Sequence, residues 1–310
     1  MHFFQYNKNK KFPFHGMSVA MGNFDGLHIG HKAVINMAKP DSDAVKFGVL
    51  TFEPHPRQFF SPGSAPFRLM SKSSKSYELK LMGLDTLIEI PFNSTIARLE
   101  PKVFIETLLF KYFRLSNIVV GEDFKFGFQR KGDANLLKQI GKTFDIKVII
   151  APLVKTNDSE ISSTAIRKAL SRGNPKKAKQ MLGRWYSIIG SVLEGDKRGR
   201  LLGFPTINLE LDNIHLPKFG VYSAIANVLT GRHKGSYMAA ASIGERPTYG
   251  KNRPNLEVHL LNFSGNLYFE KVAVSLVAFQ RPEIKFNSSN ELIKQMKKDC
   301  YVATKTLKNV

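Results

Sequence analysis

The sequence predicts an α/β domain followed by a mainly β domain: a doubly wound parallel sheet, then a small antiparallel β-barrel with a terminal helix. Three observations predict this. Short apolar segments alternate with helical ones up to about residue 184, which is typical of a parallel sheet covered on both faces. From Trp185 the segments are strand-like and broken by glycine-containing turns, as in small barrels. The last segment is again helical. We place the domains at 1–184 and 185–310.

The first half reads as strand and helix in regular alternation. Strands rich in β-branched and aromatic residues are expected at 17–24, 45–54, 85–92, 117–124 and 145–153. Helices are expected at 31–39, 76–84, 101–114 and 134–144. Pro101 suits the first position of the third of these helices. Ligands bind beyond the carboxyl ends of such strands, so the loops after "VAM", "VLTF" and "IVVG" are expected to share one rim.

Two short helices end the first half, and the second half, from about Trp185, is built of strands until its last helix. The helices are expected at 162–173 and 175–183, with Gly173 and Gly183 as C-terminal caps. Strands are expected within 186–196, 207–211, 220–244 and 256–279, with hairpin turns at "TGRHKG" (230–235) and "NFSGN" (262–266). A helix at 288–307 closes the chain, with Ser288 or Ser289 as its N-cap.

Composition bounds the class of protein. The 310 residues are 43% hydrophobic, which fits a globular protein. Cys300 is the one cysteine, and no apolar run is long enough to span a bilayer. The N-terminus lacks the basic and then apolar segments of a secretory signal, so we expect a cytoplasmic protein. The net charge of +21 raises a rival interpretation, a nucleic-acid-binding protein. Because the basic residues are scattered and no nucleic-acid module is recognisable, we expect no nucleic-acid or membrane partner.

The stretch "GNFDGLHIGH", residues 22–31, leaves a strand and enters a helix. Glycines there allow close approach of a phosphate to backbone N–H groups, and the helix N-terminus favours an anion. His28 and His31 stand three residues apart, so both can point at one phosphate. Two alternatives remain open: a zinc pair, which would need further ligands, and a plain glycine-rich turn with solvated histidines.

Two further motifs in the first half suit a nucleotide site. Asp123 in "VVGEDFKFG" ends a strand, where it can contact a nucleotide or cap the turn. "ISSTAIR", residues 161–167, begins a helix with Ser/Thr caps. Arg167, one turn further on, can reach a phosphate as a bidentate donor, or can be a solvated basic residue.

The second half offers a magnesium site and a base. In "GDKRGRLLGFPTINLEL", Thr206 and Asn208 lie two apart, so in a strand they face one side and offer two neutral oxygens to Mg²⁺. The alternative is a turn before a polar strand face. In "LEVHLLNF", Glu257 alternates with apolar residues. It can be a general base for a hydroxyl group, or simply a solvated carboxylate.

Taken in order, these segments resemble the bacterial bifunctional riboflavin kinase/FAD synthetase family. The resemblance covers about residues 17–300. It rests on "GNFDGLHIGH", "TFEPHPR", "GEDFKFG", "RKGD", "ISSTAIR", "GDKRGRLLGFPTINL", "GVY", "IGERPTYG", "LEVHLLNF" and "RPEIKF". It implies an N-terminal FMN adenylyltransferase domain of the nucleotidyltransferase type and a C-terminal riboflavin kinase barrel. Riboflavin, FMN and ATP would be the substrates, and FAD, ADP and pyrophosphate the final products. A weak homo-oligomer is left open.

The resemblance also implies roles for individual residues. His28 and His31 would contact ATP phosphates and favour attack on the α-phosphate, with Arg167 also on the phosphates. Glu257 would be the base on the flavin ribityl 5′-hydroxyl. Thr206 and Asn208 would hold Mg²⁺–ATP, which makes Mg²⁺ the expected cofactor. The remaining nucleotide-site residues would be Gly22, Asn23, Phe24, Asp25, Gly26, Asp123, Ser163 and Thr164 in the first half, and Gly199, Arg200 and Gly203 in the second.

Two positions depart from the family pattern without removing a reactive group. Ile207 stands where alanine is usual, between the two expected metal ligands. Ala165 stands where many relatives have arginine, which leaves the local phosphate charge more dependent on Arg167. A rival interpretation keeps the adenylyltransferase and makes the barrel a flavin-binding module without kinase activity.

Overall fold

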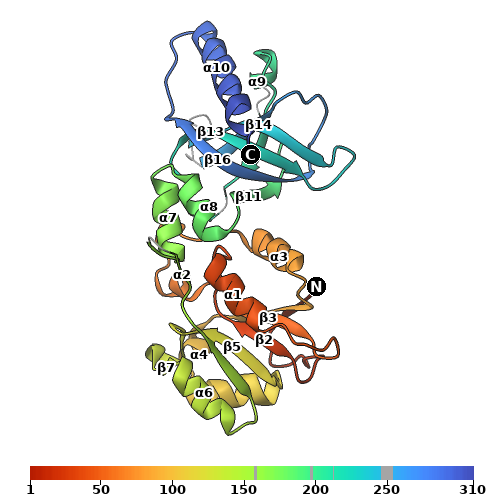
Figure 1. The fold of residues 1–310 in the computed structure, drawn as a ribbon, viewed down its shortest axis with the longest axis vertical. Helices are drawn as coiled ribbons and strands as arrows, with labels where there is room; N and C mark the ends of the chain where they lie inside the picture. Colours follow the sequence, from red (N-terminus) through yellow and green to blue (C-terminus); the bar gives the residue numbers. More distant parts are fainter. Residues whose placement is uncertain (157–158, 196–197, 212, 246–253) are drawn as a thin grey trace. The chain divides into compact units, whose positions relative to one another are not determined.

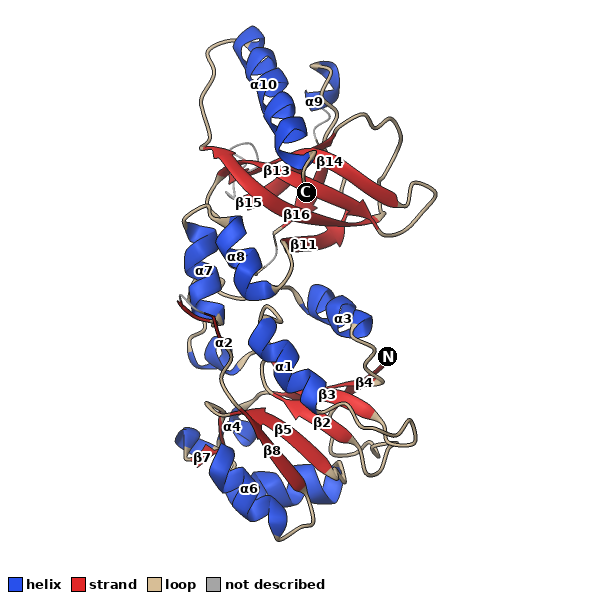
Figure 2. Cartoon of the chain, in the orientation of Figure 1, coloured by secondary structure: helices blue, strands red, loops and turns tan. Residues whose placement is uncertain are grey.

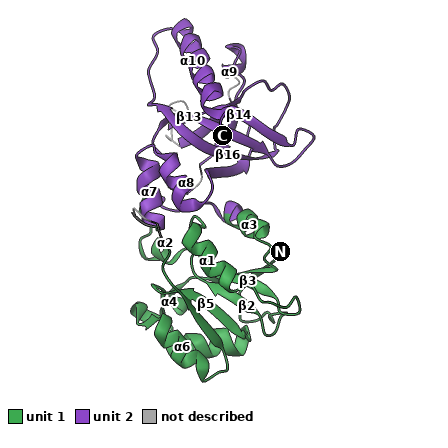
Figure 3. Cartoon of the chain, viewed as in Figure 1, with its two compact units in different colours: residues 1–65, 75–161 green, residues 66–74, 162–310 purple. Residues whose placement is uncertain are grey.

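The chain forms two compact units, and the chain passes between them more than once. The computed structural model describes residues 1–156, 159–195, 198–211, 213–245 and 254–310. The first unit comprises Met1–Ala65 and Lys75–Ile161; the second comprises Pro66–Ser74 and Ser162–Val310 (Figure 3). By its contacts, therefore, the segment Pro66–Ser74 belongs with the C-terminal part of the chain. Which residues serve each activity is a separate matter, and the boundary at 184/185 stays a prediction.

The first unit is built on a wholly parallel sheet, as predicted, which has six strands. Its order is β1-β4-β3-β2-β5-β8. The strands are β1 (His2–Gln5), β2 (Ser18–Met21), β3 (Phe47–Glu53), β4 (Thr86–Pro91), β5 (Asn117–Gly121) and β8 (Lys147–Ala151). All of β2 and nearly all of β3 is buried, because helices cover both faces of the sheet (Figure 2). The order reverses between β2 and β5, so this is the switch point where such sheets bind ligands.

The first unit contains the predicted helices between its strands, together with short helices and two small ribbons that were not predicted. The helical elements are α1 (Ile29–Met37), α2 (Pro56–Phe60), α3 (Lys72–Leu81, which begins in the segment shared with the second unit), α4 (Ser94–Ala97), α5 (Pro101–Phe104), η1 (Ile105–Tyr112), η2 (Phe128–Arg130) and α6 (Ala134–Lys142). Two small ribbons pair β6 (Lys125–Phe126) with β7 (Gly132–Asp133), and β9 (Lys155–Thr156) with β10 (Ser159–Glu160).

The helix predicted at 101–114 is present but is not uniform. One turn of α-helix from Pro101 is followed by a π-helix over η1. The wider turn still buries Ile105, Leu108 and Leu109 in the core under the sheet. The edge strand β1 was not predicted. Its residues alternate only weakly, and its place is set by pairing with β4.

The second unit includes two helices that the sequence analysis assigned to the first domain, and it continues as a six-stranded antiparallel sheet, as predicted. The helices are α7 (Ser163–Ser171) and α8 (Pro175–Leu182), and Gly183 ends α8 at φ +69°. The sheet order is β11-β16-β13-β14-β15-β12. Its strands are β11 (Tyr186–Ser191), β12 (Ile207–Glu210), β13 (Gly220–Val228), β14 (Gly235–Glu245), β15 (Pro254–Leu260) and β16 (Lys271–Arg281), with a short α9 (Arg198–Leu201) before β12. A bridge from Leu193 to Asn208 joins the two edges and nearly closes the barrel (Figure 1).

One of the two predicted hairpins is confirmed and one is wrong. β13 and β14 pair directly across the turn at 229–234. The turn predicted at 262–266 does not form a hairpin, because β15 pairs with β14 and β12 while β16 pairs with β11 and β13. β16 is buried over Val272–Val277 and is paired on both sides, between β11 and β13. The local turn signal is overridden by the burial that this central strand gains.

The terminal helix α10 (Ser289–Leu307) covers the barrel, and Ser288 is its N-cap. Val277, Ala303 and Leu307 form a small core against which the one tryptophan, Trp185, packs. No helix among the described residues has the length and apolar composition needed to cross a membrane.

Candidate active sites

The loop after β2 is a tight, largely buried turn at the switch point of the parallel sheet. Its backbone takes positive φ at Phe24 (49°), Gly26 (87°) and Leu27 (46°). Leu27 is fully buried and Asp25 is 6% exposed. A Cβ at Gly22 would come within 3.1 Å of the Phe24 ring. The turn is therefore buried and has a defined backbone conformation, and the alternative of a plain solvated turn is not supported.

His28 and His31 lie together at the start of α1. His28 is the N-cap, and its Nδ1 accepts a hydrogen bond from the His31 backbone N–H at 3.2 Å. The two rings stack with centroids 3.5 Å apart and 19° between planes. Parallel stacked rings do not converge on a metal, and no cluster of three metal-ligating residues exists in the part of the chain that the structure describes. The geometry therefore disfavours the zinc alternative.

Burial keeps both histidines neutral at physiological pH. It lowers the pKa of His28 to about 4. The pKa of His31 lies well below its ordinary value, chiefly through burial and further through the charges of His28 and Lys75. The Nδ1 atom of His31 is buried without a hydrogen-bond partner. A neutral imidazole still carries one N–H group, so each ring can donate one hydrogen bond to a phosphate at the helix N-terminus.

Lys75 is a residue of this site that the sequence analysis missed. It is 7% exposed on α3, and its Nζ donates to the Asn23 carbonyl at 3.0 Å. It thus holds the backbone of the loop after β2. Its position in "SKSSKS" resembles that of any surface lysine, and only the fold turns it inward. The sequence carried no signal that separated it from the other lysines of the helix.

Asp123 lies at the same edge of the sheet, as predicted. β5 is parallel to β2 and directly beside it, so the loops after both strands meet at one edge. The carboxylate of Asp123 folds back over Gly121, where an added Cβ would be 3.0 Å from Oδ1. The side chain is exposed. It is available to a ligand at the switch point.

Ser163, Thr164 and Arg167 lie in the second unit, on α7. Ser162 is the N-cap of this helix and accepts from the Ala165 N–H at 3.2 Å. Arg167 is not solvated as the alternative supposed. Its Nη2 donates to Thr164 Oγ1 at 3.1 Å, and its Nη1 donates to the Phe67 carbonyl at 3.2 Å. The guanidinium is thus fixed in direction before any ligand arrives.

In the barrel, Asn208 and Glu257 are direct cross-strand partners on β12 and β15. Asn255, two residues before Glu257 on the same face, donates from Nδ2 to Glu257 Oε1 at 3.2 Å and lies 3.5 Å from Asn208 Oδ1. Asn255 was missed by the sequence analysis, although its i, i+2 spacing from Glu257 could have indicated it. The pairing brings an amide oxygen and a carboxylate together.

Thr206 lines two cavities of the barrel. One, of about 220 Å³, is also lined by Glu257, His259, Phe286 and Met296. The second, of about 280 Å³, is also lined by Thr206. Its other lining residues include Arg200, Phe263, Ser264 and Asn266. A hydroxyl at the edge of both cavities is well placed between a donor and an acceptor substrate.

The loop that carries Thr206 is tightly folded. The Phe204 N–H donates to the Gly199 carbonyl at 2.8 Å, and Gly203 adopts φ +83°. A Cβ at Gly199 would collide with the Phe204 carbonyl oxygen. His259 Nδ1 lies 2.8 Å from the Pro205 carbonyl and ties the loop to β15. Residues 246–250 of the "IGERPTYG" motif and 196–197 of the basic loop lie outside the described residues.

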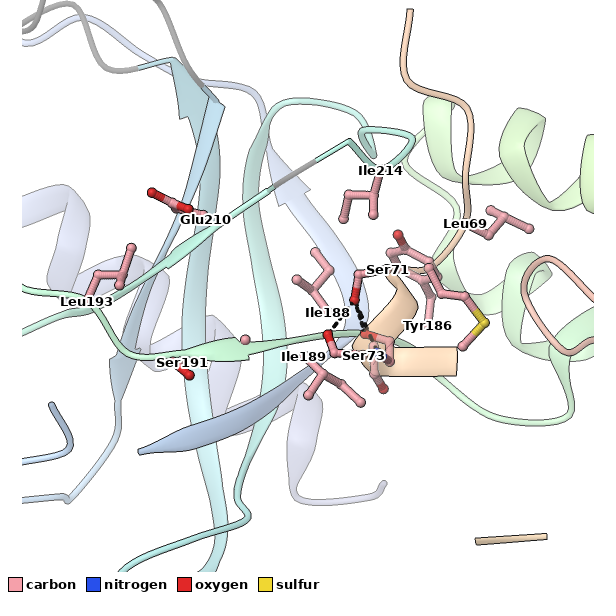
Figure 4. A pocket seen from close by; sticks show the side chains of 14 residues that line it. Leu69, Ser71, Ser73, Tyr186, Ile188, Ile189, Ser191, Leu193, Glu210 and Ile214 are labelled. Atoms are coloured by element: carbon pink, nitrogen blue, oxygen red, sulfur yellow. Dashed lines mark hydrogen bonds between the residues drawn. The ribbon is translucent and has the colours of Figure 1, made fainter. Parts of the chain in front are cut away.

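A third cavity, of about 210 Å³, contains none of the predicted site residues. It lies in the second unit between β11 and the segment Pro66–Ser74. The Ser71 hydroxyl lies 2.9 Å from the hydroxyls of both Ser73 and Ser74 at one side of this cavity, and Ile188 and Ile214 supply apolar walls (Figure 4). The hydroxyls of Ser73 and Ser74 are thus within hydrogen-bond distance of Ser71, and Tyr186 and Glu210 also line the cavity.

Comparisons with known proteins agree with this arrangement. A family model described as FAD synthetase matches residues 11–165, and one described as riboflavin kinase matches residues 182–307. A bifunctional riboflavin kinase/FMN adenylyltransferase of Haemophilus influenzae is 37% identical, with 93% of each chain covered. One from Escherichia coli K12 is 35% identical, covering 93% of this chain and 91% of that protein.

One solved structure matches this chain over nearly its whole length. A Streptococcus pneumoniae protein named as a macrolide-efflux protein superimposes with a TM-score of 0.84 at 32% identity, covering 98% of this chain and 99% of that one.

Proposed function

The chain belongs to the bifunctional riboflavin kinase/FMN adenylyltransferase family, and from this premise we propose how its residues divide the work. The enzyme phosphorylates riboflavin with ATP to give FMN, and adenylylates FMN with a second ATP to give FAD and pyrophosphate. Both family models and the curated relatives support these activities rather than efflux. The observation that carries the assignment is the pair of separate sites, one at the sheet switch point and one at Thr206 in the barrel. We also propose that the enzyme works in the cytoplasm.

We propose that adenylyl transfer takes place at the loop after β2. A phosphate oxygen of FMN attacks the α-phosphorus of ATP, the bond to the β-phosphate oxygen breaks, and pyrophosphate leaves. His28 and His31 donate N–H groups to the phosphates, and the α1 N-terminus stabilises the negative charge. On the family resemblance, Arg167 is proposed to pair with the ATP phosphates, and its guanidinium is already directed by Thr164 and Phe67.

The other residues of this site have supporting roles. Gly22 and Gly26 let the backbone approach the nucleotide, while Asn23, Phe24 and Asp25 shape the loop. Asp123 is proposed to contact the nucleotide at the neighbouring strand end. Ser163 and Thr164 supply a helix start and the hydroxyl that orients Arg167. Neither a covalent intermediate nor a nucleophilic side chain is needed, because positioning and charge stabilisation supply most of the catalysis of phosphoryl-group transfer.

We propose that the kinase step takes place around Thr206. Glu257 removes the proton from the ribityl 5′-hydroxyl. The hydroxyl oxygen attacks the γ-phosphorus of ATP, and ADP leaves. Glu257 lines the 220 Å³ cavity with apolar residues suited to a flavin ring. Arg200 lines the 280 Å³ cavity, where it can pair with ATP phosphates, and Gly199 and Gly203 give the loop its fold.

Magnesium fits the residues at this point. Thr206 and Asn208 offer neutral oxygens, the donor type that Mg²⁺ accepts alongside phosphate oxygens and water. Asn208 is 9% exposed, and Glu257 lies opposite it on the neighbouring strand. Mg²⁺ bound there would neutralise charge on the ATP phosphates. The chain's own part is to fix the two oxygens, since the bridge from Leu193 to Asn208 and the contact of His259 with Pro205 hold the loop and strand.

The proposal is tested by following both products. The purified protein is incubated with riboflavin, ATP and Mg²⁺, and FMN and FAD are separated over time. Both are expected, and the absence of both would overturn the assignment. Glu257→Gln should abolish FMN formation and leave FAD formation from supplied FMN. Glu194→Gln, an exposed position on the same unit, is the matched control. Unchanged riboflavin kinase activity in Glu257→Gln would refute the role of Glu257. A wild-type protein that makes FAD from supplied FMN but no FMN from riboflavin would instead favour a barrel that only binds flavin.

A further inference from the structure

His215, in the connection between β12 and β13, contacts the helix that carries Arg167. Its Nε2 lies 3.1 Å from the Arg167 carbonyl and 2.9 Å from Ser171 Oγ. Three residues later, the Lys218 N–H donates to the Leu170 carbonyl at 3.0 Å. The connection therefore holds α7 by its C-terminal half. All of these residues lie within the second unit.

The chemistry of the contact sets the protonation of His215. A carbonyl oxygen only accepts hydrogen bonds, so Nε2 carries the proton. Burial lowers the pKa of His215, with the Arg167 charge acting in the same direction and the bond to the Arg167 carbonyl opposing it. The imidazole is therefore neutral near pH 7, with the hydrogen on Nε2.

His215 also holds the segment that directs the Arg167 side chain. Its backbone N–H donates to the Arg68 carbonyl at 2.6 Å, next to a parallel bridge between Arg68 and Ile214. The neighbouring residue, Phe67, accepts from Arg167 Nη1 at 3.2 Å, and its ring lies 5.7 Å from the guanidinium carbon. The His215 side chain thus holds the main chain of Arg167. The His215 main chain holds the segment whose Phe67 carbonyl accepts from the Arg167 guanidinium.

We propose that His215 is a positioning residue for FMN adenylyl transfer. It lies within the part of the chain matched by the riboflavin kinase model, yet it orients a residue of the other activity. The inference rests on the role proposed above for Arg167 on the ATP phosphates. It makes adenylyl transfer dependent on a side chain that the kinase reaction does not use.

The test compares His215→Ala with His215→Gln in the full chain. Loss of one hydrogen bond of this kind costs about 1 kcal/mol, roughly fivefold in binding. His215→Ala should therefore raise the KM for ATP in FAD formation by about threefold to tenfold, with riboflavin kinase constants within about twofold of wild type. His215→Gln keeps an N–H donor at matching reach and should restore most of the loss. His15→Ala, at an exposed histidine, is the matched control.

Three results would overturn the proposal: an unchanged KM for ATP in His215→Ala, an equal loss of both activities, or no advantage of Gln over Ala. If His215→Ala does not fold, His215→Gln is compared with His215→Asn. The Asn amide is one bond too short to reach the Arg167 carbonyl, so equal kinetics of these two variants would refute the proposal. Wild-type protein that makes no FAD from FMN would instead refute the proposed function itself.

Discussion

The ion pair between Arg281 and Asp299 offers a sharp test of what holds α10 on the barrel. Asp299 is 5% exposed and accepts from Arg281 Nε at 2.9 Å, from Arg281 Nη2 at 2.6 Å and from Gln295 Nε2 at 2.8 Å. Asp299→Ala leaves the guanidinium without its partner. Removing one member of a buried pair costs about 3–5 kcal/mol. The Arg281 side chain is 17% exposed and keeps some access to water, so we expect the lower end, about 3 kcal/mol.

The loss should be visible in the thermal unfolding of the second unit. For a unit of this size about 1 kcal/mol shifts Tm by roughly 2–4 °C, so Asp299→Ala should lower Tm by about 6–12 °C. Trp185 fluorescence is the assay, because this lone tryptophan packs against the Val277, Ala303 and Leu307 core. Glu106→Ala, which breaks an exposed pair in the first unit, should leave that signal unchanged. A fall in Tm below about 2 °C for Asp299→Ala would refute the reasoning.

Three further predictions concern the two sites. Lys75→Met frees the Asn23 carbonyl and removes a charge beside His31, so the rate of FAD formation from FMN should fall at least about tenfold. Lys80→Met, at an exposed position on the same helix, should leave that rate unchanged, and steady-state kinetics of both variants test this. Gly199→Ala forces a Cβ against the Phe204 carbonyl, so riboflavin kinase activity should be lost with FMN adenylyltransferase activity retained, and equal loss of both would contradict it. Burial lowers the pKa of His28 from 6.5 to about 4, so the unfolded chain binds a proton between these values that the native chain does not. Stability of the first unit should therefore fall by up to about 3 kcal/mol as pH drops through this window, and urea unfolding followed by circular dichroism should show a flatter dependence for His28→Gln.

The sequence predicted the two architectures because their periodicities differ and are strong. Apolar runs at β2, β3 and β5 alternating with helical segments specify a parallel sheet, and the histidine pair falls at its switch point. The loops that carry the histidine pair and Asp123 were predicted to share one edge because they follow neighbouring parallel strands. Their roles in catalysis stay predictions.

What the sequence did not reveal depends on contacts between distant residues. The turn at 262–266 has the composition of a hairpin, but β16 gains more by pairing between β11 and β13. Lys75 and His215 become notable only because folding brings them to Asn23 and to Arg167. Neither residue belongs to a local pattern, and each partner is more than forty residues away in the chain.

The segment Pro66–Ser74 affects how this enzyme can be divided into fragments. It is encoded inside the N-terminal half, yet its partners include Ile214 and His215. A fragment cut at the boundary between the two activities would strip this segment from those partners, and an isolated kinase fragment would lose one wall of the cavity at β11. The segment is consecutive with the first half in sequence but packs with the second, so a single cut separates it from the residues that it contacts in the full chain.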